Sequence, residues 1–137
     1  MNGIRIIVDT NLIFAALIPK ASRIREVLFD NKYTFFCPNF VISEIFLHKE
    51  KLIRYSKLND QEFYLYLNGI IECINFIPNG FISKDSRQMA YDLCKDVDLK
   101  DLPFVAMSIE MKCPFWTGDK KLKEALRIKK WNHFFNG

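Results

Sequence analysis

The stretch IRIIVDTN, residues 4–11, decides the fold that the sequence predicts. Ile4–Val8 is a short apolar run rich in β-branched residues, and the polar residues Asp9, Thr10 and Asn11 follow it directly. Such a run is typical of a buried strand in a parallel sheet, because both faces of that sheet are covered. Functional groups in parallel sheets gather beyond the carboxyl ends of the strands, so we expect Asp9 at such an edge.

Short apolar strands alternate with helical segments along the rest of the chain. Further strands are predicted at residues 33–37, 74–77 and 113–116, with an edge strand at 131–135. Helices are predicted at residues 22–29, 40–53, from Asn59 or Asp60 through 71, and at 83–94, 103–111 and 120–128. Ser22 would cap the first of these, Pro38 would stand at the start of the second, and Met89, Ala90 and Leu93 would point inward from the helix at 83–94. Pro19 ends the apolar run 12–17. This alternation predicts an α/β fold, a three-layer α/β/α sandwich with a central, mainly parallel sheet.

Composition fits a single globular domain over residues 1–137. Half of the residues are hydrophobic and 26% are charged, and no repeat, low-complexity tract or Gly/Ser linker interrupts the chain. These values exclude a disordered chain. The net charge of +4 permits a polyanionic partner without demanding one. No signal peptide and no apolar stretch long enough to span a membrane is visible, so a cytoplasmic location is expected.

The cysteines are far apart in the sequence and form no C-x-x-C pair. Each lies among apolar residues: Cys37, Cys73, Cys94 and Cys113. This spacing gives little support to a zinc site. We expect reduced, buried thiols.

Acidic residues follow the predicted strands at four places. Asp9 follows the first strand, Glu44 comes about one turn into the helix after the second, Asp98 and Asp101 stand around the start of a later helix, and Asp119 follows the fourth strand. Carboxylates brought to one edge repel each other and raise one another's pKa. Mg²⁺ or Mn²⁺ would relieve that repulsion, since both take oxygen ligands. A metal held in this way supports hydrolysis of a phosphodiester.

Each acid also has an ordinary structural explanation. Asp9 could begin a turn, Glu44 could lie on an exposed helix face, Asp101 could favour a helix N-terminus and Asp119 could be an N-cap. The order and placement of all four together favour the metal site. A haloacid-dehalogenase-type phosphatase also begins with a strand and an Asp, but it needs a second acid two residues on, where Asn11 stands.

At these residues the sequence resembles the PIN domain family, the nuclease fold shared by the VapC toxins of toxin–antitoxin modules. The resemblance rests on four blocks in order: the strand ending in DTN at 9–11, SE at 43–44 in an apolar helix, DLKDLPFVA at 98–106 and WTGDKKL at 116–122. Together they span nearly the whole chain. The opening block alone has little specificity, whereas the four in order are strongly specific.

The resemblance implies a metal-dependent endoribonuclease that cleaves single-stranded RNA at a Mg²⁺ or Mn²⁺ site. The residues carried over as catalytic are Asp9, Glu44, Asp101 and Asp119. The metal would be bound by Asp9, Asp101, Asp119 and Asp98. Asn11, which would brace Asp9, and Thr117 would shape the site. Whether Asp98 or Asp101 is the principal third acid stays open. A non-catalytic PIN-like module that binds RNA or a protein is the alternative.

Basic residues crowd the segments after two of the acids and are candidates for phosphate contacts. We name Lys120, Lys121 and Arg127 after Asp119, and Lys49 and Arg54 after Glu44. Contacts of this kind make binding salt-dependent. Solvated helix faces are the simpler explanation for any one of them. His48 shares a helix face with Glu44 and could touch substrate or metal, or be a surface histidine.

Partners follow from the same resemblance. Many members of the family form homodimers, and the 13 Phe suit an apolar interface, so a homodimer is expected. If the chain is a toxin, an antitoxin protein should cover the acidic cleft and place a basic side chain there. If no such partner exists, a housekeeping role in RNA processing is favoured.

Overall fold

A parallel sheet stands at the centre of the computed structural model, which describes residues 3–18 and 22–137. Within these residues one four-stranded sheet has the order β3-β2-β1-β4. Its strands are β1 (Ile4–Val8), β2 (Tyr33–Pro38), β3 (Ile74–Ile77) and β4 (Phe115–Trp116), and every pairing is parallel. The predicted stop at Pro19 and the side chain of Ser22 lie outside the described residues.

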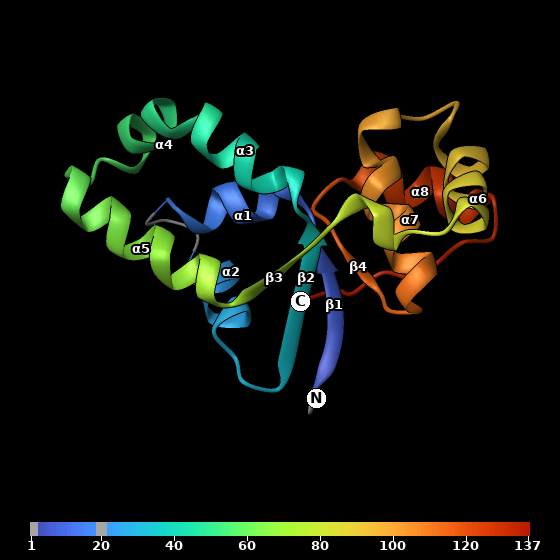
Figure 1. Ribbon diagram of the computed structural model, residues 1–137, viewed down its shortest axis with the longest axis horizontal. Coiled ribbons are helices and arrows are strands. Elements are labelled where there is room, and N and C mark those ends of the chain that lie inside the picture. Colours follow the sequence, from blue (N-terminus) through green and yellow to red (C-terminus); the bar gives the residue numbers. More distant parts are fainter. Residues whose placement is uncertain (1–2, 19–21) are drawn as a thin grey trace.

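Helices cover both faces of this sheet. They are α1 (Thr10–Ala16), α2 (Ser22–Leu28), α3 (Phe40–Leu47), α4 (Lys49–Ser56), α5 (Asp60–Glu72), α6 (Lys84–Cys94), α7 (Leu102–Met111) and α8 (Lys120–Ile128), with 3-10 turns η1 (Asn79–Phe81) and η2 (Leu99–Asp101). In Figure 1, α1 to α5 lie on one side of the sheet and α6 to α8 on the other. The predicted three-layer α/β/α sandwich is confirmed.

The buried core extends over both faces of the sheet, and one part of it forms where the sheet meets α7. Ile6, Ile7 and Val8 of the central strand β1 are fully buried, as the apolar run predicts for a strand covered on both faces. Helix α7 packs on β1 and β2, and α6 packs on α7 from outside. Residues 104–108 of α7 are all buried, so this helix is fixed firmly and positions whatever stands at its N-terminus.

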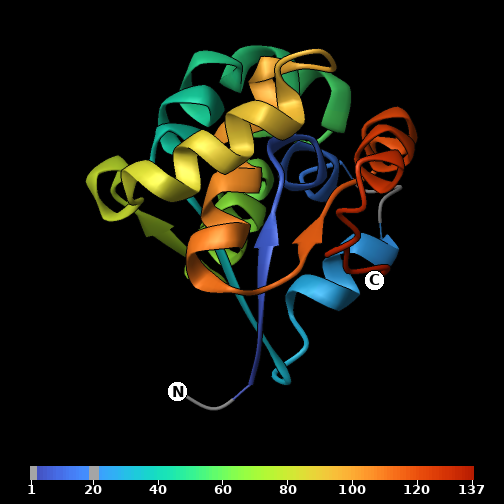
Figure 2. The same ribbon diagram turned by 90° about the vertical axis from the view of Figure 1, so that its right-hand side faces the viewer.

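The carboxyl ends of the neighbouring strands β1 and β4 reach the same edge of the sheet. Ile7 pairs with Phe115 and Val8 with Trp116. Figure 2 shows the two arrows side by side and pointing the same way. The segments that follow the strands, beginning at Asp9 and Thr117, therefore emerge next to each other, and the Asp9 amide donates to the Trp116 carbonyl at 3.1 Å.

The helix predicted over residues 40–53 differs from the structure in two ways. The single helix predicted over residues 40–53 is two helices, because the chain bends at His48 (φ −100°, ψ 10°) while apolar residues on both sides keep a nearly helical spacing. Pro38 ends β2, where it pairs with Ile77, and the helix begins at Phe40.

Met89 does not point inward, since 54% of it is exposed. The buried line of α6 is formed by Ser86, Ala90 and Cys94, each one turn from the next, and Met89 falls beside that line.

The predicted edge strand at 131–135 is reduced to one bridge, between Phe115 and Phe134. Strand β4 has only two residues, and the bridge depends on two hydrogen bonds around Phe115, to the His133 carbonyl and from the Phe135 amide. There is too little strand here for a longer pairing.

All four cysteines are free thiols, and three of them, Cys37, Cys94 and Cys113, are buried. Burial raises the pKa of Cys94 and of Cys113 to about 11. These thiols therefore stay protonated and belong to the core. Within the described chain, no helix is both long and apolar enough to cross a membrane.

Candidate functional site

A cleft of about 730 Å³ opens at the carboxyl edge of the sheet. Five carboxylates line it, contributed by the end of β1, by α3, by the η2 turn and by the start of α8: Asp9, Glu44, Asp98, Asp101 and Asp119. Asp9 and Asp119 are more than a hundred residues apart in the sequence. Parallel topology is what brings them to one place.

Asp9 stands deepest in this cleft. It is only 5% exposed, and its two oxygens are both engaged: Oδ1 accepts the Leu12 amide at 2.9 Å, and Oδ2 accepts the hydroxyl of Thr117. Burial raises the pKa of Asp9, the two hydrogen bonds lower it, and the charge of Asp119 raises it further. The carboxylate is therefore held in one orientation with its charge only partly compensated.

Asn11 and Thr117 interact with Asp9 in different ways. Thr117 is 2% exposed, donates to Asp9 and accepts the Asp119 amide at 3.2 Å, so its hydroxyl joins the two acids. The Asn11 side chain is exposed and lines the cleft, and Asn11 acts on Asp9 through its backbone amide. The hydrogen bonds that orient Asp9 thus come from Leu12 and Thr117.

Asp101 and Asp98, the two candidates for the third acid, are placed differently. Asp101 stands before α7 in the N-cap position but makes no side-chain cap hydrogen bond, and it is half-buried. Burial, followed by the charges of Asp98, Asp119 and Asp9, raises the pKa of Asp101 to about 6. Asp98 is exposed and its Oδ1 accepts the Lys100 amide at 3.0 Å. Asp101 is thus the less exposed of the two, and it lacks the backbone hydrogen bond that Asp98 accepts.

Asp119 is the N-cap of α8, where its Oδ1 accepts the Leu122 amide at 3.1 Å. Its side chain is exposed at the cleft. The structural explanation, a helix cap, and the functional one are therefore compatible at this residue, because capping uses only one of the two carboxylate oxygens.

Glu44 reaches the cleft from α3, together with His48 on the same helix face. Their side chains lie 3.5 Å apart, between Nε2 and Oε2. The His48 ring meets Phe14 edge-on, with the ring centroids 5.8 Å apart. Phe40 meets Phe104 in the same manner, also at 5.8 Å, and all four rings line the cleft. The cleft lining therefore combines carboxylates with aromatic rings.

Lys100 lines the cleft and is a residue that the sequence reasoning missed. It is exposed, and its ammonium group has no hydrogen bond or ion pair within the described residues. The signal was present, since Lys100 lies inside the third acidic block, but no motif distinguishes it from any other surface lysine. Its charge lowers the pKa of Asp101 against the stronger effects of burial and the other carboxylates.

The basic residues predicted to bind RNA lie outside the lining of the cleft. Lys120 and Lys121 are exposed in the first turn of α8, next to Asp119. Arg127 donates to Asn132 and lies over the Phe134 ring, while Lys49 lies 5.8 Å from the centre of the Tyr64 ring and Arg54 is exposed on α4.

Comparison with known proteins supports the sequence resemblance. A family model described as PIN domain matches residues 7–132, nearly the whole chain. The chain belongs to the PIN domain family. Among solved structures, its fold is similar to VapBC2 from Rickettsia felis, crystallised bound to a DNA fragment from its promoter. That match has a TM-score of 0.62 and 15% identity, and covers 89% of this chain and 93% of the other. A comparison with curated proteins gave no match.

PIN domains are generally nucleases that use divalent metals, and the donor set of this PIN domain suits such an ion. The candidate ligands are carboxylate oxygens, which Mg²⁺ and Mn²⁺ prefer. Burial, followed by the charges of the neighbouring carboxylates, raises the pKa of Asp101 among them. Within the described residues no group of three or more His, Cys, Asp or Glu side chains is placed so that it could hold a metal ion. Mg²⁺ can bind with fewer protein ligands, because it keeps several waters and needs only one or two carboxylates.

Proposed function

We propose that this PIN domain is a metal-dependent endoribonuclease that hydrolyses phosphodiester bonds of single-stranded RNA. The observation that carries the proposal is the convergence of Asp9, Asp101 and Asp119 at one cleft, with Asp98 and Glu44 beside them. Five carboxylates in one cleft make a poor phosphate site unless a cation is bound among them. Mg²⁺ or Mn²⁺ held by these acids would supply that positive charge and would lower the pKa of a bound water.

Each acid has a distinct part in this proposal. Asp9 is fixed by Thr117 and the Leu12 amide, so it offers the metal a carboxylate that needs no reorientation. Asp101 is the principal third acid, since no hydrogen bond occupies its oxygens within the described chain, and Asp98 assists from the rim. Glu44 lines the cleft from α3, where it can orient an attacking water.

Single-stranded rather than duplex RNA is proposed because aromatic rings line the cleft. Phe40 is 39% exposed and lines the same cleft as Phe14 and His48. Unpaired bases stack on such rings without regard to sequence, whereas bases in a duplex are already stacked on each other. Lys100 is the cation in the cleft lining that can meet a phosphate.

Cleavage of a mixed-sequence single-stranded RNA tests this function directly. The reaction is run with Mg²⁺, with Mn²⁺ and with EDTA, using wild type, Asp9→Asn and Asp119→Asn. Asn is as good an N-cap as Asp, so both variants lose a charge and keep the cap of α1 or α8. We expect metal-dependent cleavage that falls at least about a hundredfold in both variants, the loss typical of one essential stabilising group.

Asp85→Asn is the matched control, because Asp85 is exposed in the first turn of α6 and does not line the cleft. It should cleave at the wild-type rate. Cleavage that persists in EDTA, or full activity in Asp9→Asn, would contradict the metal mechanism. A folded wild type that neither cleaves RNA nor binds metal would indicate a non-catalytic PIN-like binding module.

We also propose that the chain is the toxin of a type II toxin–antitoxin pair, with a small antitoxin as protein partner. Its support is the similarity in fold to VapBC2 and the strongly acidic cleft, which a basic side chain of a partner could fill. Co-expression with the product of an adjacent small reading frame should yield a co-purifying complex without RNase activity. An adjacent product that neither binds nor inhibits would contradict the toxin role.

A further inference from the structure

A second cavity, of about 260 Å³, lies beside the acidic cleft. It opens between the η1 turn, the start of α7 and the end of β2, and Pro103 lines both cavities. The strand order β3-β2-β1-β4 explains the adjacency, because β2 lies between β3 and β1, so the segments after β3 and β2 follow the segment after β1 along one edge of the sheet. An extended polymeric ligand that runs from the acidic cleft along this edge of the sheet would reach the second cavity next.

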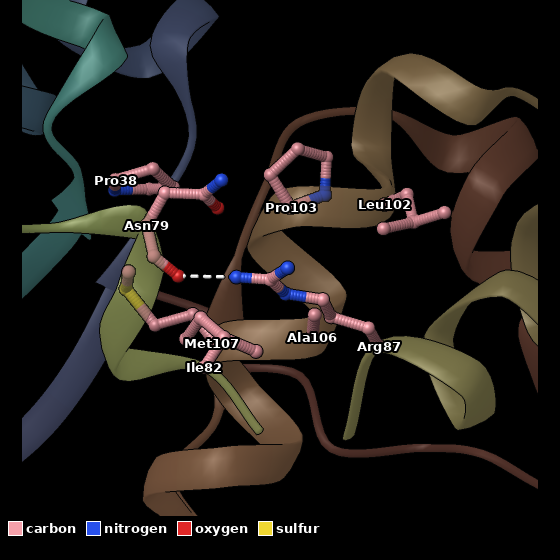
Figure 3. Close-up of a pocket in the computed structure, with 8 residues that line it drawn as sticks. All are labelled: Pro38, Asn79, Ile82, Arg87, Leu102, Pro103, Ala106 and Met107. Carbon is pink, nitrogen blue, oxygen red and sulfur yellow. Dashed lines mark hydrogen bonds between the residues drawn. The ribbon is translucent and has the colours of Figure 1, made fainter. Parts of the chain in front are cut away.

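The walls of this cavity are apolar and its rim is polar. Figure 3 shows Ile82, Ala106 and Met107 on one side and the rings of Pro38 and Pro103 on the other. These five side chains offer no hydrogen-bonding group, so an apolar, flat ligand would be held by contact with them.

Asn79 and Arg87 form the polar rim. The Arg87 guanidinium crosses from α6 and its Nη2 donates to the Asn79 carbonyl at 2.6 Å. Figure 3 shows the Asn79 side-chain amide beside Pro38 and pointing toward Pro103. This amide has no hydrogen-bond partner in the described structure, and it can donate and accept at once. Arg87 has further N–H groups for an anion.

We propose that this cavity receives one unpaired nucleobase of the RNA strand, from a nucleotide next to the scissile phosphate. The proposal rests on the proposed nuclease function and names a specificity site for it. The base would lie between the apolar walls, the Asn79 amide would pair with a donor and an acceptor on its edge, and Arg87 would contact the adjoining phosphate. The structure thus predicts a base preference at one position near the cut.

Nucleotide binding to the whole chain tests the cavity without any need for cleavage. AMP, GMP, CMP and UMP are titrated separately into ¹⁵N-labelled protein, with ribose 5-phosphate as the probe that lacks a base. We expect one nucleotide to shift the Asn79 side-chain amide and the backbone signals of η1 and the start of α7 more than the others. No shift there, or equal shifts with ribose 5-phosphate, would overturn the base pocket.

RNA cleavage provides a second test of the base pocket. Short RNAs spanning a mapped cut are made with one abasic position at a time. For wild type, one abasic position should lower kcat/KM about tenfold, which is the size of one specific base contact. Asn79→Ala should lose that positional sensitivity while still cleaving, and Asn68→Ala, an exposed asparagine on α5, should keep it.

Ala106→Leu takes up space in the cavity while Asn79 and Arg87 are both kept, and it should also lose the sensitivity. If Asn79→Ala and Ala106→Leu both fold and keep the wild-type profile, the inference is wrong although the nuclease is real. If wild type binds a nucleotide here but cleaves no RNA, the proposed function fails and the base pocket stands.

Discussion

The Thr117 hydroxyl, together with the Leu12 amide, fixes the orientation of the Asp9 carboxylate. It is buried and donates to a carboxylate that is itself only 5% exposed. Thr117→Val keeps the shape and removes the donor, so a buried charge loses a partner. We expect a loss of about 1 to 3 kcal/mol in the free energy of unfolding, measured by urea denaturation.

Thr34→Val is the matched control for that change. Thr34 lies on β2, is partly exposed and makes no side-chain hydrogen bond in the described structure. Its free energy of unfolding should change by less than about 0.5 kcal/mol. Equal effects of the two substitutions would show that the Thr117–Asp9 bond does not stabilise the fold.

Asp101 should make the stability of the metal-free protein depend on pH. Its pKa is raised from 3.8 to about 6, so the ionised form is less favourable in the folded chain than in the unfolded one. The stability that this group contributes is complete below its unfolded pKa and is lost as the pH rises through about 6. In EDTA, Asp101→Asn should therefore melt at a higher Tm than wild type near about pH 7.5, and the difference should shrink near about pH 4. A Tm difference that does not change with pH would contradict this account.

Lys100 should contribute one phosphate contact. Binding of a fluorescent single-stranded RNA is measured across a salt series, in the Asp119→Asn background so that the RNA is not cut. Lys100→Gln should weaken binding and reduce the slope of log K against log salt by about 0.7, the value for one contact to a single strand. Lys112→Gln, at the opposite end of α7, is the control and should leave the slope unchanged. An unchanged slope in Lys100→Gln would show that Lys100 contacts no phosphate.

At the scale of elements, the basic residues after Asp119 divide into two groups. Lys129 bonds to Asp96 and to the Leu93 carbonyl, and so ties the end of α8 to α6. Arg127 is held by Asn132 and Phe134. Lys120 and Lys121, in contrast, are exposed in the first turn, beside the cleft acid Asp119.

This division predicts different effects for substitutions within one helix. Lys120→Gln with Lys121→Gln should weaken RNA binding and its salt dependence without changing Tm. Arg127→Gln should lower Tm slightly and leave RNA binding alone. Binding assays and thermal melts on the same samples check both statements, and loss of RNA binding in Arg127→Gln would contradict the second.

The elements themselves were largely predictable where hydrophobic pattern and caps agree. Helix α8 begins and ends where the sequence indicates, after the Asp119 cap, and α5 begins at an Asn59 capping box. The break at His48 was not predictable, because the hydrophobic period continues across it. Met89 was misplaced since a helix of small buried residues gives no strong apolar line from which to orient it.

At the scale of the whole molecule, the acidic cleft was predictable and the second cavity was not. Asp9 and Asp119 each follow a strand, so parallel topology alone sends them to one edge. The second cavity combines Asn79 after β3, Arg87 on α6 and Pro103 on α7, and no spacing in the sequence indicates that these three residues meet. Lys100 was missed for a related reason, since its importance depends on which charges surround it.

A homodimer is the last prediction, and its observation is the distribution of exposed apolar side chains. Helices α3 to α5 carry Phe46 at 53% exposure, Leu47 at 75% and Leu65 at 67%. Burying such side chains against a second copy removes apolar surface from water, and full burial of each stabilises the dimer by about 1.5 to 3 kcal/mol.

Light scattering should give twice the 16.2 kDa chain mass if the protein is a homodimer. Leu47→Glu should shift the protein to monomer, whereas Ile128→Glu, 83% exposed on α8, should leave the dimer intact. A monomer mass for wild type at all concentrations would refute the dimer, and a dimer equally weakened by both substitutions would place its interface elsewhere.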